Sequence, residues 1–543
     1  MRPTLLLRRS RRWAALCLVA VLVTAMSGCA KAGGGTPDSS TASTPLSDSG
    51  RELDDVTVAL PGSLSSLYVG QEAGILNYYV AALTQEGLVS LDASGKVVPA
   101  LAETWEQPDA TTYVFDLRPD ARFQDGSEVT AEDVAFSLQE AADPTLSPSL
   151  SGYLANLDSV TATGDNQVTV KVKAPDAAFL KNLSTAGAAF VTKKEFWQEH
   201  DGKVGTSTSL LLGTGPYRVT SFTPDSGLTL ERVDTWWGGV PKAKKIDVRF
   251  IADENTRFLA AQSGEVDLAF NVPVPQVSQW QSIQGWRVEK VNDLSYVGLN
   301  FDTRVAPFDD PDVRKAIAYA VDKEAIVTNL LQGNGEVATS IATPESLTGT
   351  YSPDEARQKL AAVSPQYTYD LAKAKESLAA SKHPDGFTAE LVYPSTGPQL
   401  GTAAQAISQS LAEIGITVTV KEQPIEDWLA TLGDGSHGIG FMWYFSTTGD
   451  PAEVPSYLLG ADNISGYTNA TATDLLTKIG NETDPARRID LILQLESLQA
   501  NDATNIPLWW GKSLTAFSGD VGLRDDSAFS FVSSWGSNLY ATS

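Results

Sequence analysis

Few residues of this sequence carry the side chains from which enzymes build catalytic centres. The 543-residue chain has three histidines, His200, His383 and His437, and two cysteines, Cys17 and Cys29. The histidines stand far apart among polar or glycine-rich neighbours, and no G-x-S-x-G, H-E-x-x-H or P-loop sequence occurs. Imidazole is the common protein ligand for metals such as nickel. The sequence therefore predicts no catalytic residue, no metal site built from protein ligands and no cofactor.

One loop gathers aromatic and polar side chains. Residues 440–451, GFMWYFSTTGDP, read as an aromatic strand that ends in a polar loop at Asp450 and Pro451. Asp450 and Glu453 have the spacing of a capping box, with proline at the first helical position. On this pattern the Asp450 carboxylate is used locally, as a helix cap.

Size and charge narrow the classes of protein. A chain of 543 residues is too long for one ordinary core, so we expect two or three domains. The hydrophobic fraction of 42% is that of a globular protein, and the net charge is −26. An acidic surface repels phosphate backbones and anionic headgroups, which argues against nucleic-acid binding.

The N-terminus reads as an export signal. Several arginines precede an apolar run from Trp13 to Met26, which is short for a membrane span. The run ends in Met26-Ser27-Gly28-Cys29, which resembles a bacterial lipobox. We therefore expect residues 1–28 to be a lipoprotein signal peptide and Cys29 to carry the lipid, with the choice between the general and twin-arginine export routes open.

Residues 29–52 are expected to be a flexible tether. Most of this stretch is Gly, Ser, Thr, Pro and Ala without apolar periodicity, so it cannot bury enough surface to order itself. Since Cys17 lies inside the signal, the mature chain would have one cysteine and no internal disulfide. The predicted location is extracytoplasmic, with a lipid anchor in the outer face of the bacterial cell membrane.

The stretch from Tyr296 to Val327 predicts a strand followed by a helix. Val297, Leu299 and Phe301 alternate with other residues as in a half-buried strand. Asp310 and Pro311 then supply a cap and a first helical residue. This pattern fits a crossing between two domains, and it equally fits an ordinary strand-to-helix step.

Longer segments resemble one family. The runs VVPALAETW, YVFDLRPDARFQDGSEVTAEDVAFSL, GTGPYRV and GLNFDTRVAPFDDPDVRKAIAYAVDKEAIV resemble the solute-binding proteins, family 5, of peptide and nickel ABC importers. The resemblance extends from about Asp54 to the C-terminus. Two positions depart from the family pattern. Gln124 replaces the usual histidine, and Leu67-Tyr68-Val69 replaces the usual Leu-Asp-Pro.

The resemblance implies an α/β, two-lobed, periplasmic-binding-protein-like fold (type II, cluster C). Lobe I would comprise residues 53–300 and 506–543, with a small subdomain inserted at about 70–212, and lobe II residues 301–505. The chain would cross between the lobes near Asn300 and Ile506. Two lobes joined by two crossings can close around a ligand by hinge motion.

The resemblance also implies a site. In peptide-binding members an aspartate of the loop at 440–451 pairs with the ligand's α-ammonium, and Asp450 would take that role here. A carboxylate in a partly desolvated cleft distinguishes a free ammonium from neutral analogues. Other ligand-binding candidates are the aromatic residues Trp443, Tyr444 and Phe445, together with Thr447 and Tyr153. The capping and anchoring roles of Asp450 exclude each other, and both stay open.

We therefore expect a binding lipoprotein that catalyses no reaction. It would capture short peptides between the lobes and deliver them to ABC permease subunits with their ATPases. A different small solute, such as an oligosaccharide or a metal chelate, is the first alternative. A signalling lipoprotein that passes ligand occupancy to a partner is the second. The altered loop at Leu67-Tyr68-Val69 leaves the ligand class undecided.

Overall fold

The computed structural model describes residues 47–543 except 73, 396 and 462. The expected signal at 1–28, Cys29 and most of the expected tether lie outside the described residues. The last part of that tether contacts the C-terminal end, where Ser49 N donates to Ala541 O at 2.9 Å and Arg524 pairs with Asp48. No helix among the described residues is long and apolar enough to cross a membrane.

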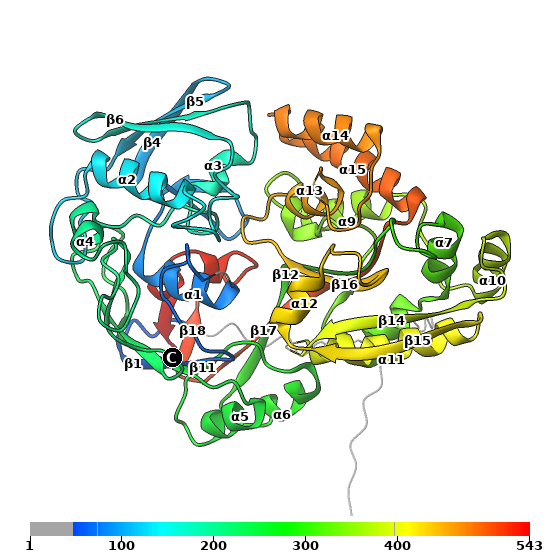
Figure 1. Cartoon of the computed structure of the whole chain (residues 1–543). Coiled ribbons are helices and arrows are strands. Elements are labelled where there is room, and N and C mark those ends of the chain that lie inside the picture. The colour runs from blue at the N-terminus through cyan, green and yellow to red at the C-terminus, as the bar shows by residue number, and fades with distance from the viewer. Residues whose placement is uncertain (1–46, 73, 396, 462) are drawn as a thin grey trace, which may run out of the picture. The chain divides into compact units, whose positions relative to one another are not determined.

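Two long strands organise the fold (Figure 1). β12 (Arg287–Phe301) and β17 (Asn505–Phe517) pair antiparallel, from Arg287 beside Phe517 to Asn300 beside Asn505. They stand in the middle of one mixed sheet, whose order is β15-β14-β16-β12-β17-β11-β1-β10-β9-β8. The other strands are β15 (Ile416–Gln423), β14 (Phe387–Pro394), β16 (Ile439–Phe445), β11 (Leu268–Ala269), β1 (Leu53–Leu60), β10 (Ala243–Phe250), β9 (Gly227–Arg232) and β8 (Tyr217–Thr223).

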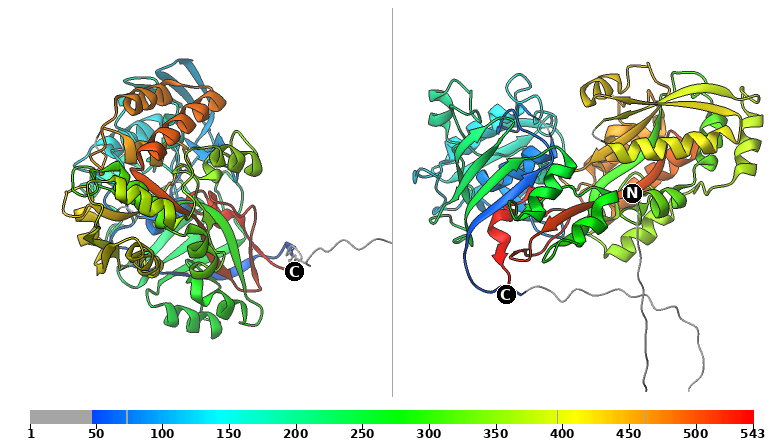
Figure 2. Two further views of the ribbon diagram at one scale, coloured as in Figure 1. Left: turned by 90° about the vertical axis from the view of Figure 1, so that its right-hand side faces the viewer. Right: turned by 90° about the horizontal axis from the view of Figure 1, so that it is seen from below.

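The apolar cores divide along these two strands. One set of buried side chains runs from Val56 to Leu294 and resumes at Leu514, whereas a second set runs from Tyr296 to Trp510. The two lobes therefore have separate cores, joined through β12 and β17. The right-hand view of Figure 2 shows the two bodies of the chain and the strands between them. The change from one core to the other lies between Leu294 and Tyr296 on β12 and between Trp510 and Leu514 on β17.

The pairing of β12 with β17 is irregular at this changeover. The register shifts between Asn292 and Tyr296, and Asp293 is buried at the irregularity. Its carboxylate accepts hydrogen bonds from Ser295 N at 2.8 Å and from Ser513 Oγ at 3.0 Å. A β-bulge interrupts the ladder and bends the bulged strand locally.

The end of β12 corrects one prediction. The alternation at residues 296–301 suggested a half-buried strand, but every residue there is buried. Tyr296 packs into one lobe II cluster, while Val297, Leu299 and Phe301 pack into another. β12 lies between β16 and β17, and both of its faces are covered, so even its polar positions are removed from water.

A four-stranded sheet forms a small subdomain of lobe I, in the order β4-β5-β7-β6. The helix α2 (Ala131–Ala142) packs on it. α2 begins with a capping box formed by Thr130 and Asp133. The strands are β4 (Ala102–Asp109), β5 (Thr112–Leu117), β6 (Leu157–Gly164) and β7 (Gln167–Val172). The remaining elements of lobe I are α1 (Ile75–Thr84), β2 (Val89–Leu91), β3 (Val97–Pro99), α3 (Phe179–Asn182), α4 (Lys194–Glu199), α5 (Glu254–Gln262), α6 (Val277–Gln281), β18 (Val521–Leu523) and β19 (Leu539–Ala541).

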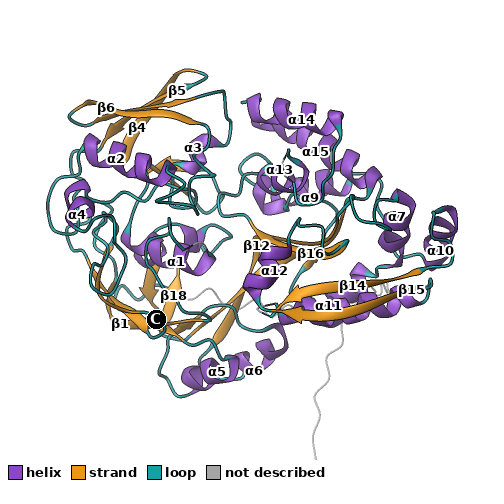
Figure 3. Ribbon diagram, viewed as in Figure 1, coloured by secondary structure: helices purple, strands orange, loops and turns teal. Residues whose placement is uncertain are grey.

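The described helices of lobe II follow β12 along the chain (Figure 3). Asp310 caps the first of them by accepting a hydrogen bond from Asp312 N, and Pro311 is its first residue, as predicted. The helices of lobe II are α7 (Pro311–Ala320), α8 (Lys323–Ala325), α9 (Pro353–Ala361), α10 (Leu371–Ala380), α11 (Pro398–Ala412), α12 (Ile425–Thr431), α13 (Glu453–Leu459), α14 (Ala470–Asn481) and α15 (Pro485–Asp502). The short strand β13 (Glu336–Val337) pairs with β17.

Candidate functional site

The loop after β16 holds Asp450 in a buried ion pair. Arg488, on α15, donates from Nη1 to Oδ2 at 2.6 Å and from Nη2 to Oδ1 at 2.8 Å, and Ala452 N donates to Oδ1 at 2.9 Å. Asp450 is only 6% exposed. Burial alone would raise the pKa of Asp450, but Arg488, with Lys181 further away, holds that pKa below its usual value. Both carboxylate oxygens are therefore engaged by lobe II itself.

The capping box expected at Asp450 and Glu453 is not formed. α13 begins at Glu453, with Ala452 as its cap residue. The Glu453 carboxylate points back along the chain and accepts hydrogen bonds from Ser446 Oγ at 2.6 Å and from Thr448. The predicted box is wrong because the Glu453 carboxylate bonds to Ser446 and Thr448 and does not return to Asp450. Asp450 keeps one local hydrogen bond, from Ala452 N, but its carboxylate is also bound by buried Arg488, which the local pattern cannot reveal.

The predicted aromatic walls are dispersed. Tyr444 donates from its hydroxyl to Glu453 Oε1 at 3.2 Å, and Trp443 is 38% exposed on lobe II. Phe445 differs from them, since it packs against the core of lobe I. Phe445 therefore bridges the two lobes.

Hydrogen bonds join the small subdomain and its neighbouring loops to lobe II, among them one from Thr348 Oγ1 to Ser94 O at 3.1 Å. The hydroxyls of Tyr153 and Thr447 lie 3.2 Å apart. Lys181 Nζ, on α3, donates to Gly449 O at 3.1 Å, beside the Asp450–Arg488 pair. Ala177 N donates to Gly480 O at 3.2 Å. Tyr153 and Thr447 are thus brought together as contacts between the lobes.

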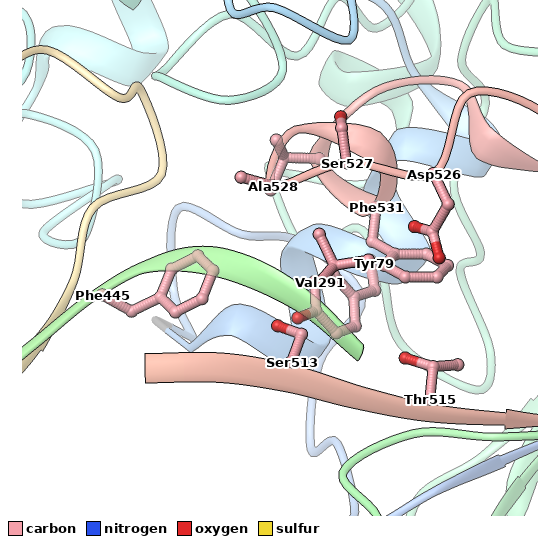
Figure 4. Close-up of a pocket in the computed structure, with 10 residues that line it drawn as sticks. Tyr79, Val291, Phe445, Ser513, Thr515, Asp526, Ser527, Ala528 and Phe531 are labelled. Atoms are coloured by element: carbon pink, nitrogen blue, oxygen red, sulfur yellow. The ribbon is translucent and has the colours of Figure 1, made fainter. Parts of the chain in front are cut away.

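A small cavity, which we call the inner cavity, lies where the two lobes meet (Figure 4). Its volume is about 10 Å³, roughly the space of one water molecule. Phe445 lines the cavity from lobe II, and the other lining residues belong to lobe I. It is lined by Tyr79, Val291, Phe445, Ser513, Thr515, Asp526, Ser527, Ala528, Phe531 and Val532.

A larger space, the outer hollow, adjoins the inner cavity. Its volume is about 580 Å³, and it shares Val291, Ser527 and Ala528 with the inner cavity. The remaining lining comes from residues 93–94, Asn292 and Phe529 of lobe I and from Glu345 and residues 348–353 of lobe II. A space of this size, lined by both lobes, can hold a small organic molecule.

Asp526 is the acidic group of the inner cavity. Its Oδ1 atom is buried and has no hydrogen-bond partner among the described residues. Burial raises the pKa of Asp526 to about 6, and nearby Glu289 adds to the rise. Arg287, the N–H of Ser527 and the hydroxyl of Ser530 oppose it only in part. This carboxylate thus differs from Asp450 in having an oxygen left over.

Neither space is lined by a described Lys, Arg or His residue. The second acidic residue, Glu345, is paired with Arg357, whose Nη2 lies 2.9 Å from Oε1. Among the described residues, no group of three or more His, Cys, Asp and Glu side chains could hold a metal ion. The uncompensated charge at these spaces is therefore negative.

Comparison with known proteins identifies the family. Residues 96–466 match the model for bacterial extracellular solute-binding proteins, family 5 (middle region), which is more than half of the chain. The protein belongs to this family.

Relatives and solved structures agree with this solute-binding fold. Glutathione-binding protein GsiB of Escherichia coli (strain K12) is 25% identical over 495 residues, which cover 88% of this chain and 93% of GsiB. AgaA of A. tumefaciens R10, solved with agropinic acid, is 26% identical with a TM-score of 0.76 and covers 90% of this chain and 98% of its own. DppA of Helicobacter pylori, solved with the peptide STSA, is 23% identical with a TM-score of 0.75, covers 91% and 99%, and supports the fold alone. The two-lobed α/β fold implied by the sequence is confirmed.

Sequence reasoning on this solute-binding protein missed Asp526. The residue stands in the segment Arg524-Asp525-Asp526-Ser527, which reads as an ordinary polar turn. Nothing local shows that Asp525 is exposed while Asp526 lines a cavity. His200, His383 and His437 line neither the inner cavity nor the outer hollow.

Proposed function

We propose that this protein is the receptor of an ABC importer that captures short peptides between its lobes and delivers them to a membrane permease. The observation that carries the proposal is the outer hollow, since its lining comes from both lobes and its volume of about 580 Å³ suits a small solute. Relatives named for glutathione and solved with the peptide STSA support peptides as the solute class.

The membrane attachment is part of the same proposal. Cys29 carries the lipid, and the residues that follow hold the folded protein at the outer face of the cell membrane. A Cys29→Ala variant should appear in the medium or periplasm, and the parent should stay with the membrane fraction. Recovery of both proteins in the same fraction would contradict lipidation at Cys29.

We further propose that Asp450 has a structural role and does not anchor the ligand. A ligand ammonium at Asp450 would have to compete with the buried Arg488 guanidinium, which already holds both oxygens. Separating a buried ion pair leaves an uncompensated charge, which is costly. Trp443 and Tyr444 then stabilise lobe II, and Phe445 is the member of this aromatic run that lies beside the ligand.

The solute itself is tested by native mass spectrometry of protein purified without refolding. We expect adducts with the masses of short peptides, released on unfolding. Uptake of labelled peptides by cells that lack the gene should fall and should recover with the parent gene. Adducts of neutral sugars only, with unchanged peptide uptake, would overturn the proposal for peptides.

A further inference from the structure

Asp526 Oδ1 is one of two buried carboxylate oxygens without a hydrogen-bond partner among the described residues, and the other, Glu86 Oε2, lines neither the inner cavity nor the outer hollow. Buried polar atoms in folded proteins are nearly always hydrogen-bonded, because an unpaired one loses its contacts with water and gains none in return. Here Oδ1 is buried and unpartnered among the described residues, although Asp526 is close enough to Ser527 and Ser530 for both to lower its pKa. A group kept in this state is a candidate for binding something that is absent from the protein alone.

Two aromatic rings of the inner cavity, those of Tyr79 and Phe531, lie on the side to which the Asp526 carboxylate points. Tyr79 and Phe531 stand 5.5 Å apart, centroid to centroid, and Figure 4 shows the Asp526 side chain directed toward them. Phe445 completes the aromatic part of the inner cavity from lobe II. The faces of such rings are electron-rich and attract cations, most strongly where water is excluded. Carboxylate and rings together favour a small positive group.

The charges around Asp526 do not supply that positive group. On β12, Arg287 donates from Nε to Glu289 Oε1 at 2.7 Å, so its charge is shared with Glu289. Asp293, also on β12, and Asp526 both raise the pKa of the Tyr79 hydroxyl through their negative charge. The segment of Asp526 itself carries Asp525, which is exposed, and Arg524, which pairs with Asp48. Among the residues that the structure describes, no cation is therefore paired with the Asp526 carboxylate.

We propose that Asp526 binds the protonated amine of the transported solute in the inner cavity, while the body of the solute occupies the outer hollow. The solute is then an amine-bearing molecule, and an unmodified peptide N-terminus is the form that the proposed function supplies. The volume of about 10 Å³ suits one ammonium group, and Val291, Ser527 and Ala528 line both this cavity and the larger space beside it. This inference rests on the proposed function and adds to that function the position of the amine subsite.

Three probes test the subsite by thermal shift and calorimetry. They are methylammonium chloride, trialanine amide and N-acetyl-trialanine amide, with sodium chloride of equal ionic strength as reference. The proteins are the parent, Asp526→Asn, and Asp525→Asn as the matched control at the exposed neighbour. We expect methylammonium and trialanine amide to stabilise the parent and the control, and the Kd for trialanine amide to rise at least about tenfold in Asp526→Asn. Acetylation should weaken binding to the parent to a similar extent.

Several results would overturn the amine subsite. These are equal responses of Asp526→Asn and the parent, equal binding of the free and acetylated peptides, or no stabilisation by methylammonium beyond that by sodium. The outcomes also separate the two proposals. If the binding of methylammonium depends on Asp526 and trialanine amide does not bind, the amine subsite stands and the peptide proposal fails. If trialanine amide binds independently of Asp526, peptide binding stands and the subsite fails.

A pH series on the parent protein tests the same idea without any variant. Methylammonium keeps its charge throughout the acid and neutral range, so any change in its binding reports on the protein. Binding needs the ionised carboxylate, so its Kd should rise roughly tenfold for each pH unit below about 6, the pKa of Asp526. A Kd that is constant from pH 7 to about pH 4, well below that pKa, contradicts the proposal, even if Asp526→Asn were not to fold.

Discussion

Asp450 and Asp526 are two acidic residues near the meeting of the lobes, and their surroundings treat them in opposite ways. Asp450 is held by a bidentate guanidinium, which keeps its pKa low. Asp526 has a buried oxygen without a partner, and burial raises its pKa to about 6. Asp450 is therefore satisfied by the fold, whereas Asp526 has binding capacity to spare.

The difference shows that a residue in a recognisable sequence motif need not have a functional group free to bind a ligand. The Gly-Asp-Pro turn at Asp450 attracts attention in the sequence, yet its charge is fully used inside lobe II. An available group is recognised by what the structure leaves unpaired. The four predictions below test this contrast, from the largest expected effect to the smallest.

The buried ion pair should give the largest effect. Arg488→Met leaves the Asp450 carboxylate buried and uncompensated, and we expect the free energy of unfolding to fall by about 3–5 kcal/mol. Urea unfolding at neutral pH measures it. Arg487→Met is the matched control, because the neighbouring Arg487 is exposed and pairs with Glu482 at the surface, where such pairs are worth about 1 kcal/mol or less. Equal losses in both variants would remove the contrast between Asp450 and Asp526.

Asp293 at the irregular part of β12 is an intermediate case, since hydroxyl and N–H groups satisfy its charge in place of a cation. A Cβ atom at Gly511 would collide with Ser295 Oγ and lie 2.9 Å from Asp293 Oδ1. We expect Gly511→Ala to lower the free energy of unfolding by about 1–3 kcal/mol. Gly440→Ala on β16, where no atom lies within 4 Å of the added Cβ, should be nearly neutral by the same urea measurement.

Asp526→Asn should stabilise the unliganded protein. The folded-state pKa of about 6 is above the ordinary value of 3.8, so ionisation costs stability at neutral pH and costs none when the carboxyl is protonated in both states. We expect a gain of about 1–2 kcal/mol at pH 7–8, which disappears as pH falls toward about 4. Thermal unfolding across this pH range measures it, with Asp525→Asn as control. A loss of stability at pH 7 would mean that Asp526 is satisfied in the way Asp450 is.

Lys181 should have the smallest effect, because it acts on the contact between the lobes and leaves each core intact. Lys181→Met removes the hydrogen bond to Gly449 O, beside Asp450. We expect the trialanine amide to dissociate about threefold faster, which corresponds to one modest hydrogen bond. Stopped-flow measurement checks the rate, with exposed Lys171→Met as control. An unchanged rate would show that this contact plays no part in retaining the ligand.

Much of the fold could be predicted because its signals are local. The cap at Asp310 depends only on residues that follow it directly in the chain, and it is confirmed. The long segments that resemble the family implied the two-lobed architecture, and the comparisons support it. The degree of burial of β12 could not be predicted in this way, because it depends on neighbouring strands and helices far away in the sequence.

The site required the tertiary structure for the same reason. The residue types of the sequence alone led to the expectation of a binding protein, with acidic and aromatic residues as the candidates for binding. Only the folded chain decided which carboxylate is free, because Arg488 is 38 residues from Asp450 and Tyr79 is hundreds of residues from Asp526. Charge and hydrogen bonding act through space over a few ångströms, whereas a local pattern reports only on neighbours along the chain.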